Sequence, residues 1–138
     1  MAVDPNDLYN IFNGTDYIQC PLTEGDAVEC NASDGLNDQI FHVGDDPEDT
    51  KLDCRFVDGG TKYYIMAVGQ DDGDVTSTSD ETKASKFKIH GDGAIQLKGT
   101  SGTDDYYLNQ SGNVVKVKKT TKQTWTWNKT KLGSSGHA

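Results

Sequence analysis

The sequence predicts a single all-β domain built from three imperfect copies of a four-strand unit. Three observations predict it. The 138 residues are only 33% apolar but include 15 glycines, which favours a small β protein with many turns over a helical bundle. A Gly-Thr-…-Tyr motif occurs three times in register, and apolar residues alternate with period two around each copy. No stretch has the periodicity of an amphipathic helix, so no helix of three or more turns is expected.

The repeated motif is a Gly-Thr turn that leads into a tyrosine and then a branched aliphatic residue. It occurs in the segments 13–18, 59–65 and 101–108. Its tyrosines are Tyr17, Tyr64 and Tyr107, which are 47 and 43 positions apart. We expect these tyrosines to occupy equivalent positions.

The match extends along each copy. After the tyrosine comes a Gly-Asp or Gly-Asn turn and then Val28, Val75 or Val114. The flanking alternating sets are Tyr9/Ile11, Leu52/Cys54/Phe56 and Ile95/Leu97 upstream, and Phe41/Val43, Phe87/Ile89 and Trp125/Trp127 downstream. Period two places each set on one face of a strand. We therefore expect a core shared by the Tyr/Ile, Val and Phe/Trp residues of the three copies, with Phe41, Phe87 and Trp125 buried.

The predicted organisation is one domain with short extensions. Residues 1–7 form a leader, and residues 8–130 form the domain. Its repeats span about 8–46, 50–91 and 93–128. Residues 131–138 are small and polar, and we expect a flexible tail there.

These repeats resemble those of β-trefoil proteins. The segments Gly60-Thr-Lys-Tyr-Tyr-Ile65, Asp72-Gly-Asp-Val75 and Lys86-Phe-Lys-Ile89 are similar to the fascin and hisactophilin type. The resemblance covers roughly residues 8–128 and implies twelve strands with pseudo-threefold symmetry. β-Trefoils include lectins, protease inhibitors, actin-bundling modules and cytokine-like ligands, so the resemblance alone implies no single function.

Charge is divided unevenly along the chain, whose net charge is −9. Residues 1–80 hold 18 Asp/Glu and 3 Lys/Arg, whereas residues 81–138 hold 4 Asp/Glu and 10 Lys. An acidic chain argues against nucleic-acid binding. The third-repeat lysines either pair with the acidic repeats or form a functional patch.

The location is predicted from the start of the chain and from its cysteines. No segment is long and apolar enough to span a membrane, and no signal peptide is visible. We expect a cytoplasmic protein with Cys20, Cys30 and Cys54 as free thiols. The alternative is secretion of a processed form, in which Cys20 and Cys30 could pair across a hairpin.

Catalytic and metal-binding patterns are missing from the sequence. It has no Gly-x-Ser-x-Gly, P-loop or Cys–His pattern, and its histidines are scattered. The acidic segments 45–49 and 71–74 lack EF-hand spacing. We predict a protein that is not an enzyme and has no cofactor and no metal.

The leading functional hypothesis is a lectin-like carbohydrate-binding protein. The ricin-type Gln-x-Trp signature is partial here, at Gln39-Ile-Phe41, Ser85-Lys-Phe87 and Gln123-Thr-Trp125. The predicted glycan site is a polar and aromatic group in the third repeat: Asp104, Asp105, Tyr106, Asn109 and Asn113. Asp and Asn offer acceptors and donors to sugar hydroxyls, and a tyrosine offers a stacking face. The alternatives are a protease inhibitor acting through the acidic loop 45–49, or an actin-binding or signalling module.

Overall fold

The structure is a computed structural model that describes residues 3–55 and 61–132, with the side chain of Arg55 left aside. Within these ranges the strands are β1 Leu8–Asn13, β2 Asp16–Gln19, β3 Glu29–Ala32, β4 Phe41–Val43, β5 Leu52–Arg55, β6 Lys62–Ala67, β7 Gly73–Thr78, β8 Phe87–Ile89, β9 Ile95–Leu97, β10 Tyr106–Ser111, β11 Val114–Lys119 and β12 Thr126–Thr130. The helical segments described are the single-turn η1 Asn37–Gln39 and η2 Glu81–Lys83, so no three-turn helix occurs there, as expected. None of these helices could cross a membrane. The predicted strand residue Phe56, the turn glycines Gly59 and Gly60, and residues 133–138 of the predicted tail lie outside the described residues.

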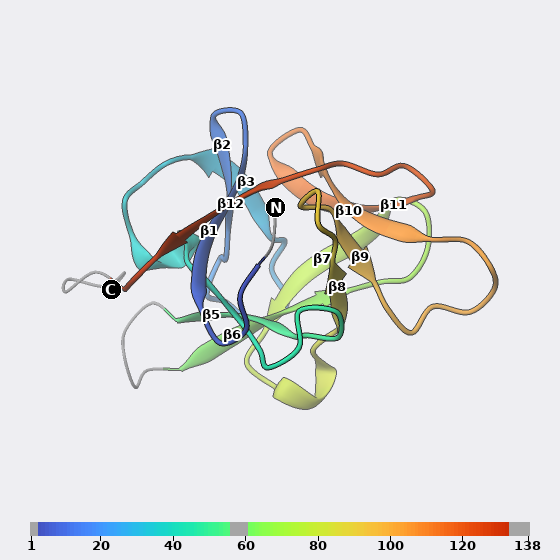
Figure 1. Cartoon of the computed structure of the whole chain (residues 1–138), viewed down its shortest axis with the longest axis horizontal. Coiled ribbons are helices and arrows are strands. Elements are labelled where there is room, and N and C mark those ends of the chain that lie inside the picture. The colour runs from blue at the N-terminus through green and yellow to red at the C-terminus, as the bar shows by residue number, and fades with distance from the viewer. Residues whose placement is uncertain (1–2, 56–60, 133–138) are drawn as a thin grey trace.

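Six strands surround the core. β1 pairs with β12 and β4, β4 pairs with β5, and β8 pairs with β9. A bridge between Thr50 and Phe87 joins the segments of β5 and β8. β9 meets β12 where the Trp127 indole Nε1 donates to the Gly93 carbonyl at 2.9 Å. The ring of strands is visible around the centre of Figure 1.

Three hairpins cover one end of this ring. They are β2–β3, β6–β7 and β10–β11, and each continues from a ring strand. Their second strands also meet one another, through Val114–Glu29, Lys116–Asp74 and the Ala27–Thr76 bridge. Six ring strands and three mutually contacting hairpins are the β-trefoil, as the repeats predict.

The register supports the predicted pseudo-threefold equivalence. Tyr17, Tyr64 and Tyr107 pair with Phe12, Asp53 and Gln96, one on each first strand. The fourth strands are equivalent as well. Phe41, Phe87 and Trp125 lie against Tyr9, Thr50 and Gly93, which each stand three residues before the first-strand partner of a repeat tyrosine. Corresponding residues of the three repeats can therefore be compared directly.

The core contains the predicted fourth-strand aromatics. Phe41 and Phe87 are fully buried, and Trp125 is 3% exposed. The Trp125 indole Nε1 donates to the Leu108 carbonyl at 3.1 Å, so its polar atom is satisfied inside the core.

Two core expectations need correction. Val114 is only half-buried, and the neighbouring Val115 lies in the core cluster in its place. Tyr64 and Tyr107 are buried but lie outside the apolar core cluster, whereas the preceding Tyr63 and Tyr106 pack against that cluster. Adjacent strand residues face opposite sides, and the aliphatic residue after each repeat tyrosine takes the inward side. The repeat tyrosines therefore belong to the outer face of the sheet.

Residues 4–7 are tied to the domain. The Lys129 ammonium contacts Asp4 at 2.6 Å and Asp7 at 3.1 Å, and these two carboxylates raise the pKa of Lys129. The Tyr9 hydroxyl accepts from the Asp4 amide at 2.7 Å. This part of the predicted leader therefore packs on β12 and β1.

Replacing Trp125 by alanine should destabilise the protein by about 3–5 kcal/mol, since it opens a cavity in the core and leaves the Leu108 carbonyl without its donor. Chemical denaturation monitored by circular dichroism measures this loss. Trp125→Phe is the matched control, because phenylalanine already occupies the equivalent positions 41 and 87. An alanine variant as stable as the wild type would contradict the core position of Trp125.

Gly93→Ala tests the contact between β9 and β12. Gly93 has φ +93°, and an added Cβ would lie 1.9 Å from the Trp125 carbonyl oxygen. We expect a loss of more than about 3 kcal/mol, from backbone strain and displacement of β12. Gly112→Ala is the control, because Gly112 also has a positive φ but no atom within 4 Å of the added Cβ. That variant should lose only about 1–2 kcal/mol in the same denaturation experiment. If both variants lost the same free energy of unfolding, the clash of the added Cβ with the Trp125 carbonyl oxygen would add no destabilisation, contrary to this prediction.

Candidate functional site

The predicted third-repeat residues do not form one cluster. Tyr106 pairs with Lys119 at the open end of the β10–β11 hairpin, whereas Ser111 pairs with Val114 at its turn. Five residue steps of about 3.3 Å separate these ends by about 17 Å. Asp104 and Asp105 lie at the open end and Asn113 at the turn, so the expectation that all five meet is wrong.

The open end of the hairpin holds Asp104, Asp105 and the half-buried Tyr106. Asp104 is 3.4 Å from the Lys119 ammonium. The Asp105 carboxylate accepts from Gln96 Nε2 at 3.1 Å, and Gln96 Oε1 lies 2.7 Å from His90 Nε2. With the amide so oriented, His90 Nε2 carries the proton. These polar groups therefore already satisfy one another.

Asn109 and Asn113 have structural roles. Asn109 is 8% exposed, and its Nδ2 donates to the Thr121 carbonyl at 2.9 Å. The Asn113 carbonyl accepts from the Cys30 amide at 2.8 Å, which links the third repeat to the first. The Asn109 side chain is therefore committed within the fold, while that of Asn113 stays exposed.

The positions of the partial Gln-x-Trp signature hold each hairpin to its fourth strand. Gln123 Oε1 accepts from the Gln110 amide at 2.8 Å, and Ser85 Oγ accepts from the equivalent Ala67 amide at 2.8 Å. Gln39 Nε2 donates instead to Gln19 Oε1 and the Ala32 carbonyl. Together with the burial of Phe41, Phe87 and Trp125, these bonds assign the signature positions to the fold.

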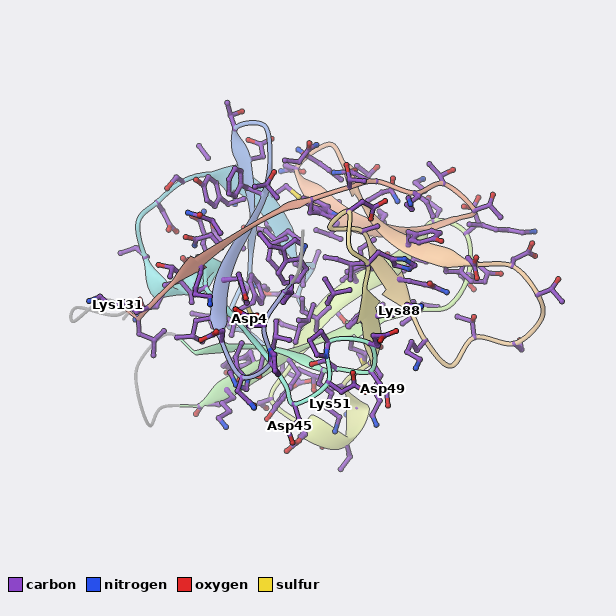
Figure 2. All side chains as sticks on the ribbon, viewed as in Figure 1. Asp4, Asp45, Asp49, Lys51, Lys88 and Lys131 are labelled. Carbon is purple, nitrogen blue, oxygen red and sulfur yellow. The ribbon has the colours of Figure 1, made fainter. Side chains whose placement is uncertain are left out.

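The acidic loop between β4 and β5 is anchored on the domain. The Pro47 carbonyl accepts from the Ile89 amide at 2.8 Å, and Glu48 is 3.7 Å from Lys88. Asp49 lies 3.6 Å from Lys86 and 3.5 Å from Lys98. Figure 2 shows Asp45, Asp49 and Lys51 at the same edge of the molecule. A segment that enters a protease cleft must offer its backbone groups to the enzyme, and this loop uses part of its own backbone on β8.

Third-repeat lysines pair with acids of the earlier repeats. Lys116 contacts Asp74 at 2.6 Å, and Lys118 contacts Asp72 at 2.8 Å. Together with the pairs to Glu48 and Asp49, these contacts favour the first reading of the charge pattern, in which the repeats attract each other. Each of these exposed pairs contributes little to stability, because water and salt screen the two charges. Among the residues described, no group of three or more His, Cys, Asp or Glu could hold a metal ion.

An open groove of about 690 Å³ lies between the second and third repeats. Ala67, Ala84, Ser85 and Leu97 line it, together with the start of the β9–β10 loop. The equivalent positions between the first and second repeats hold Cys20, Asp38, Gln39 and Cys54, of which the first three are larger than their counterparts. None of the described residues that line the groove is aromatic.

The outer face carries the repeat tyrosines in three equivalent cross-strand rows. They read Thr126–Phe12–Tyr17–Asn31, His42–Asp53–Tyr64–Thr78 and Lys88–Gln96–Tyr107–Lys118. Tyr64 is 9% and Tyr107 8% exposed, whereas Tyr17 is only half-buried. Tyr17 is thus the repeat tyrosine with the most accessible ring.

The first hairpin orients the Tyr17 ring. The tight Gly14-Thr15 turn, with Gly14 at φ +63°, places Phe12 directly opposite Tyr17. The two rings stack with centroids 4.7 Å apart and an interplanar angle of 21°. This contact restrains the ring before any ligand arrives.

A pocket of about 190 Å³ lies beside Tyr17. The polar residues Asn10, Asn37, Gln39, Ser33 and Thr130 line it, together with Leu36, Ile40, Gly35 and Lys131. This pocket combines an aromatic ring with several polar groups. Sequence reasoning missed this pocket, although the Gly14-Thr15 turn places Phe12 and Tyr17 at equal distances on either side of it.

Some polar groups of this pocket are available to a ligand. Asn10 Nδ2 donates to the Gln39 carbonyl at 2.8 Å, which fixes the orientation of the side-chain amide. Asn10 Oδ1 accepts no hydrogen bond from the residues that the structure describes. The hydroxyls of Tyr17, Ser33 and Thr130 make no hydrogen bond to any other residue that the structure describes. A ligand hydroxyl could therefore bond to them without displacing an internal partner.

A buried carboxyl lies behind the wall of the pocket. Asp38, in η1, is 2% exposed, and its carbonyl accepts from the Cys20 amide at 2.9 Å. Burial first, and then a hydrogen bond to the Asp34 carboxyl, raise the pKa of Asp38 to about 7. Asp34 in turn accepts from the Leu36 amide at 2.8 Å, so the pair holds the loop that forms this wall.

The comparisons with known proteins support the fold. A solved structure of a ricin B-like lectin from Macrolepiota procera in complex with lactose superposes with a TM-score of 0.68. The two chains are 17% identical, and the match covers 93% of this chain and 99% of the lectin. No family model and no curated protein sequence matches the chain. At this identity the similarity establishes a shared β-trefoil fold.

Asp38 should make stability fall as pH rises from about 4 to about 7. Its pKa is higher in the folded state than the ordinary 3.8, so in this window the folded protein binds more protons than the unfolded chain. The slope is at most about 1.4 kcal/mol per pH unit for one proton. Asp38→Asn should flatten the curve of unfolding free energy against pH and raise stability at pH 8.

Asp26→Asn is the control for this experiment, since it removes an exposed carboxylate. Its curve should retain the wild-type slope between pH 4 and 7. If Asp38→Asn retains that slope as well, another group titrates in this window.

Proposed function

We propose that the protein is a carbohydrate-binding β-trefoil of the lectin type, which binds a glycan and leaves it chemically unchanged. The observation that carries the proposal is the pocket beside Tyr17. It joins a restrained aromatic ring to amide and hydroxyl groups, and these are the groups that sugar recognition uses. The structural similarity to a lectin solved with lactose adds support from the fold.

The binding geometry follows from the residues of the pocket. One apolar face of a sugar ring would stack on Tyr17, whose other side rests on Phe12. The sugar hydroxyls would bond to Asn10 Oδ1 and to the hydroxyls of Ser33 and Thr130. The volume of about 190 Å³ lies below the roughly 300–1,000 Å³ of drug-sized sites, which favours a single sugar residue.

The affinity of one such site should be low. Each good hydrogen bond contributes about 0.5–1.5 kcal/mol net, and association has its own entropic cost. We expect measurable binding mainly on a multivalent glycan surface, where several copies can act together.

The third-repeat residues Asp104, Asp105 and Tyr106 remain a second candidate location for the same function. They lie together at the exposed end of the β10–β11 hairpin. Their carboxylates are already paired with Lys119 and Gln96, so a ligand would have to replace these partners. For this reason we place the primary site at Tyr17.

A glycan array followed by calorimetry with the selected glycan tests the proposal. Tyr17→Ala should weaken binding at least about tenfold, because it removes the stacking face. Tyr17→Phe keeps the ring and should lose only about threefold to tenfold, the worth of one hydrogen bond. Asp104→Ala/Asp105→Ala is the matched control and should bind like the wild type.

Circular dichroism establishes that each variant is folded. Loss of binding in the Asp104→Ala/Asp105→Ala protein, with Tyr17→Ala unaffected, would move the site to the third repeat. Wild-type protein that binds no glycan on the array would contradict the lectin proposal, and a protease inhibition panel would then test the alternative.

A further inference from the structure

Two of the three cysteines meet between repeats. Cys20 follows β2 and is 1% exposed, and Cys54 in β5 is fully buried. The Cys54 thiol donates to the Asn37 carbonyl at 3.4 Å, and the Cys20 thiol is near enough to interact electrostatically with it. The Cys20 amide donates to the neighbouring Asp38 carbonyl at 2.9 Å, so both cysteines border η1.

The pseudo-threefold symmetry explains this contact. Cys20 corresponds to Ala67, because each comes three residues after a repeat tyrosine. Cys54 corresponds to Leu97, because they pair with Tyr63 and Tyr106 respectively. Ala67 and Leu97 line the same groove between the second and third repeats. The fold therefore brings these two positions together, and between the first and second repeats both are cysteines.

Cys30 is less well placed for Cys20. Cys30 pairs directly with Ile18, so Cys20 is its diagonal neighbour across the hairpin. Diagonal neighbours in an antiparallel pair have Cα atoms about 7–8 Å apart, whereas a disulfide needs about 4.4–6.8 Å. The hairpin geometry therefore disfavours the pairing of Cys20 with Cys30 that the sequence suggested for a secreted form.

We propose that Cys20 and Cys54 form a disulfide that joins the first repeat to the second when the chain folds in the presence of a small-molecule disulfide such as oxidised glutathione. One cysteine thiolate attacks oxidised glutathione and releases one reduced glutathione, leaving a mixed disulfide. The second cysteine thiolate attacks the protein sulfur of that mixed disulfide and releases the second glutathione. The protein dithiol loses two electrons, oxidised glutathione gains them, and the two thiol protons end on the two glutathione molecules.

The environment of the pair determines when it reacts. Burial and the adjacent Cys20 raise the pKa of Cys54, so little thiolate is present in the folded protein. The bridge should therefore form during folding, while the thiols are accessible, and only slowly afterwards. Forming it removes the Cys54 S–H donor from the Asn37 carbonyl, a weak hydrogen bond.

The bridge would close a long loop. Cys20 and Cys54 are 34 positions apart, and the loop between them includes the wall of the Tyr17 pocket. Constraining this loop lowers the entropy of the unfolded chain, and a rise in Tm on the order of 10 °C is expected. The proposal of this disulfide does not depend on the proposed function, because neither Cys20 nor Cys54 lines the Tyr17 pocket.

The test refolds the reduced, denatured full-length protein in a buffer of oxidised and reduced glutathione. Free thiols are then blocked with N-ethylmaleimide under denaturing conditions and counted by mass spectrometry. We expect one blocked thiol. Trypsin should release peptide 1–51 linked by a disulfide to peptide 52–55, and fragmentation of peptide 1–51 should place N-ethylmaleimide on Cys30. The oxidised protein should melt on the order of 10 °C above the reduced protein.

Three single variants make the assignment specific. Cys30→Ser is the matched control, since it removes a buried cysteine but should keep both the bridge and the rise in Tm. Cys20→Ser and Cys54→Ser should each leave two blocked thiols and show no rise. An unlinked peptide 1–51 with an internal disulfide between Cys20 and Cys30 would overturn the proposal, as would three blocked thiols in refolded wild type at every glutathione ratio.

Discussion

The structure depends on one constraint: a four-strand repeat cannot bury its apolar face alone. Each copy contributes an inward aliphatic residue after its tyrosine (Ile18, Ile65 or Leu108) and a fourth-strand aromatic, and all of these are buried in one cluster. The core therefore exists only when the three copies close around it. Val68 is the large hydrophobic found exposed among the described residues, and the other large apolar side chains described are buried or half-buried.

This shared core leaves the outer face free to differ between repeats. The backbone keeps the three tyrosine rows equivalent, so a difference between rows arises from side chains. Tyr64 and Tyr107 are covered by their neighbours, whereas Tyr17 borders a pocket. The same reasoning applies between repeats, where Ala67 and Ala84 leave an open groove and Cys20 and Asp38 fill the equivalent space. Candidate sites occur where pseudo-symmetry is broken.

Charge acts as a secondary, adjustable contribution on this scaffold. The lysines of the third repeat contact acids of the second repeat, as in Lys116–Asp74 and Lys118–Asp72. These contacts are exposed and screened by salt, so each adds little to the stability of the fold. Figure 2 shows Lys131 at the opposite side of the view from Asp49. The remaining negative charge favours solubility.

The sequence by itself determined the fold, because alternation, turns and a threefold motif are local properties that every repeat expresses. It also identified Phe41, Phe87 and Trp125 as core residues, since their period-two spacing shows a buried face. Only the tertiary structure decided which polar residues meet. The hairpin register separates Tyr106 from Asn113, which are only seven positions apart in the sequence. The closure of the repeats brings Cys20 near Cys54, although 34 positions separate them. Side-chain proximity depends on strand register and on contacts between repeats, and distance along the chain encodes neither of them.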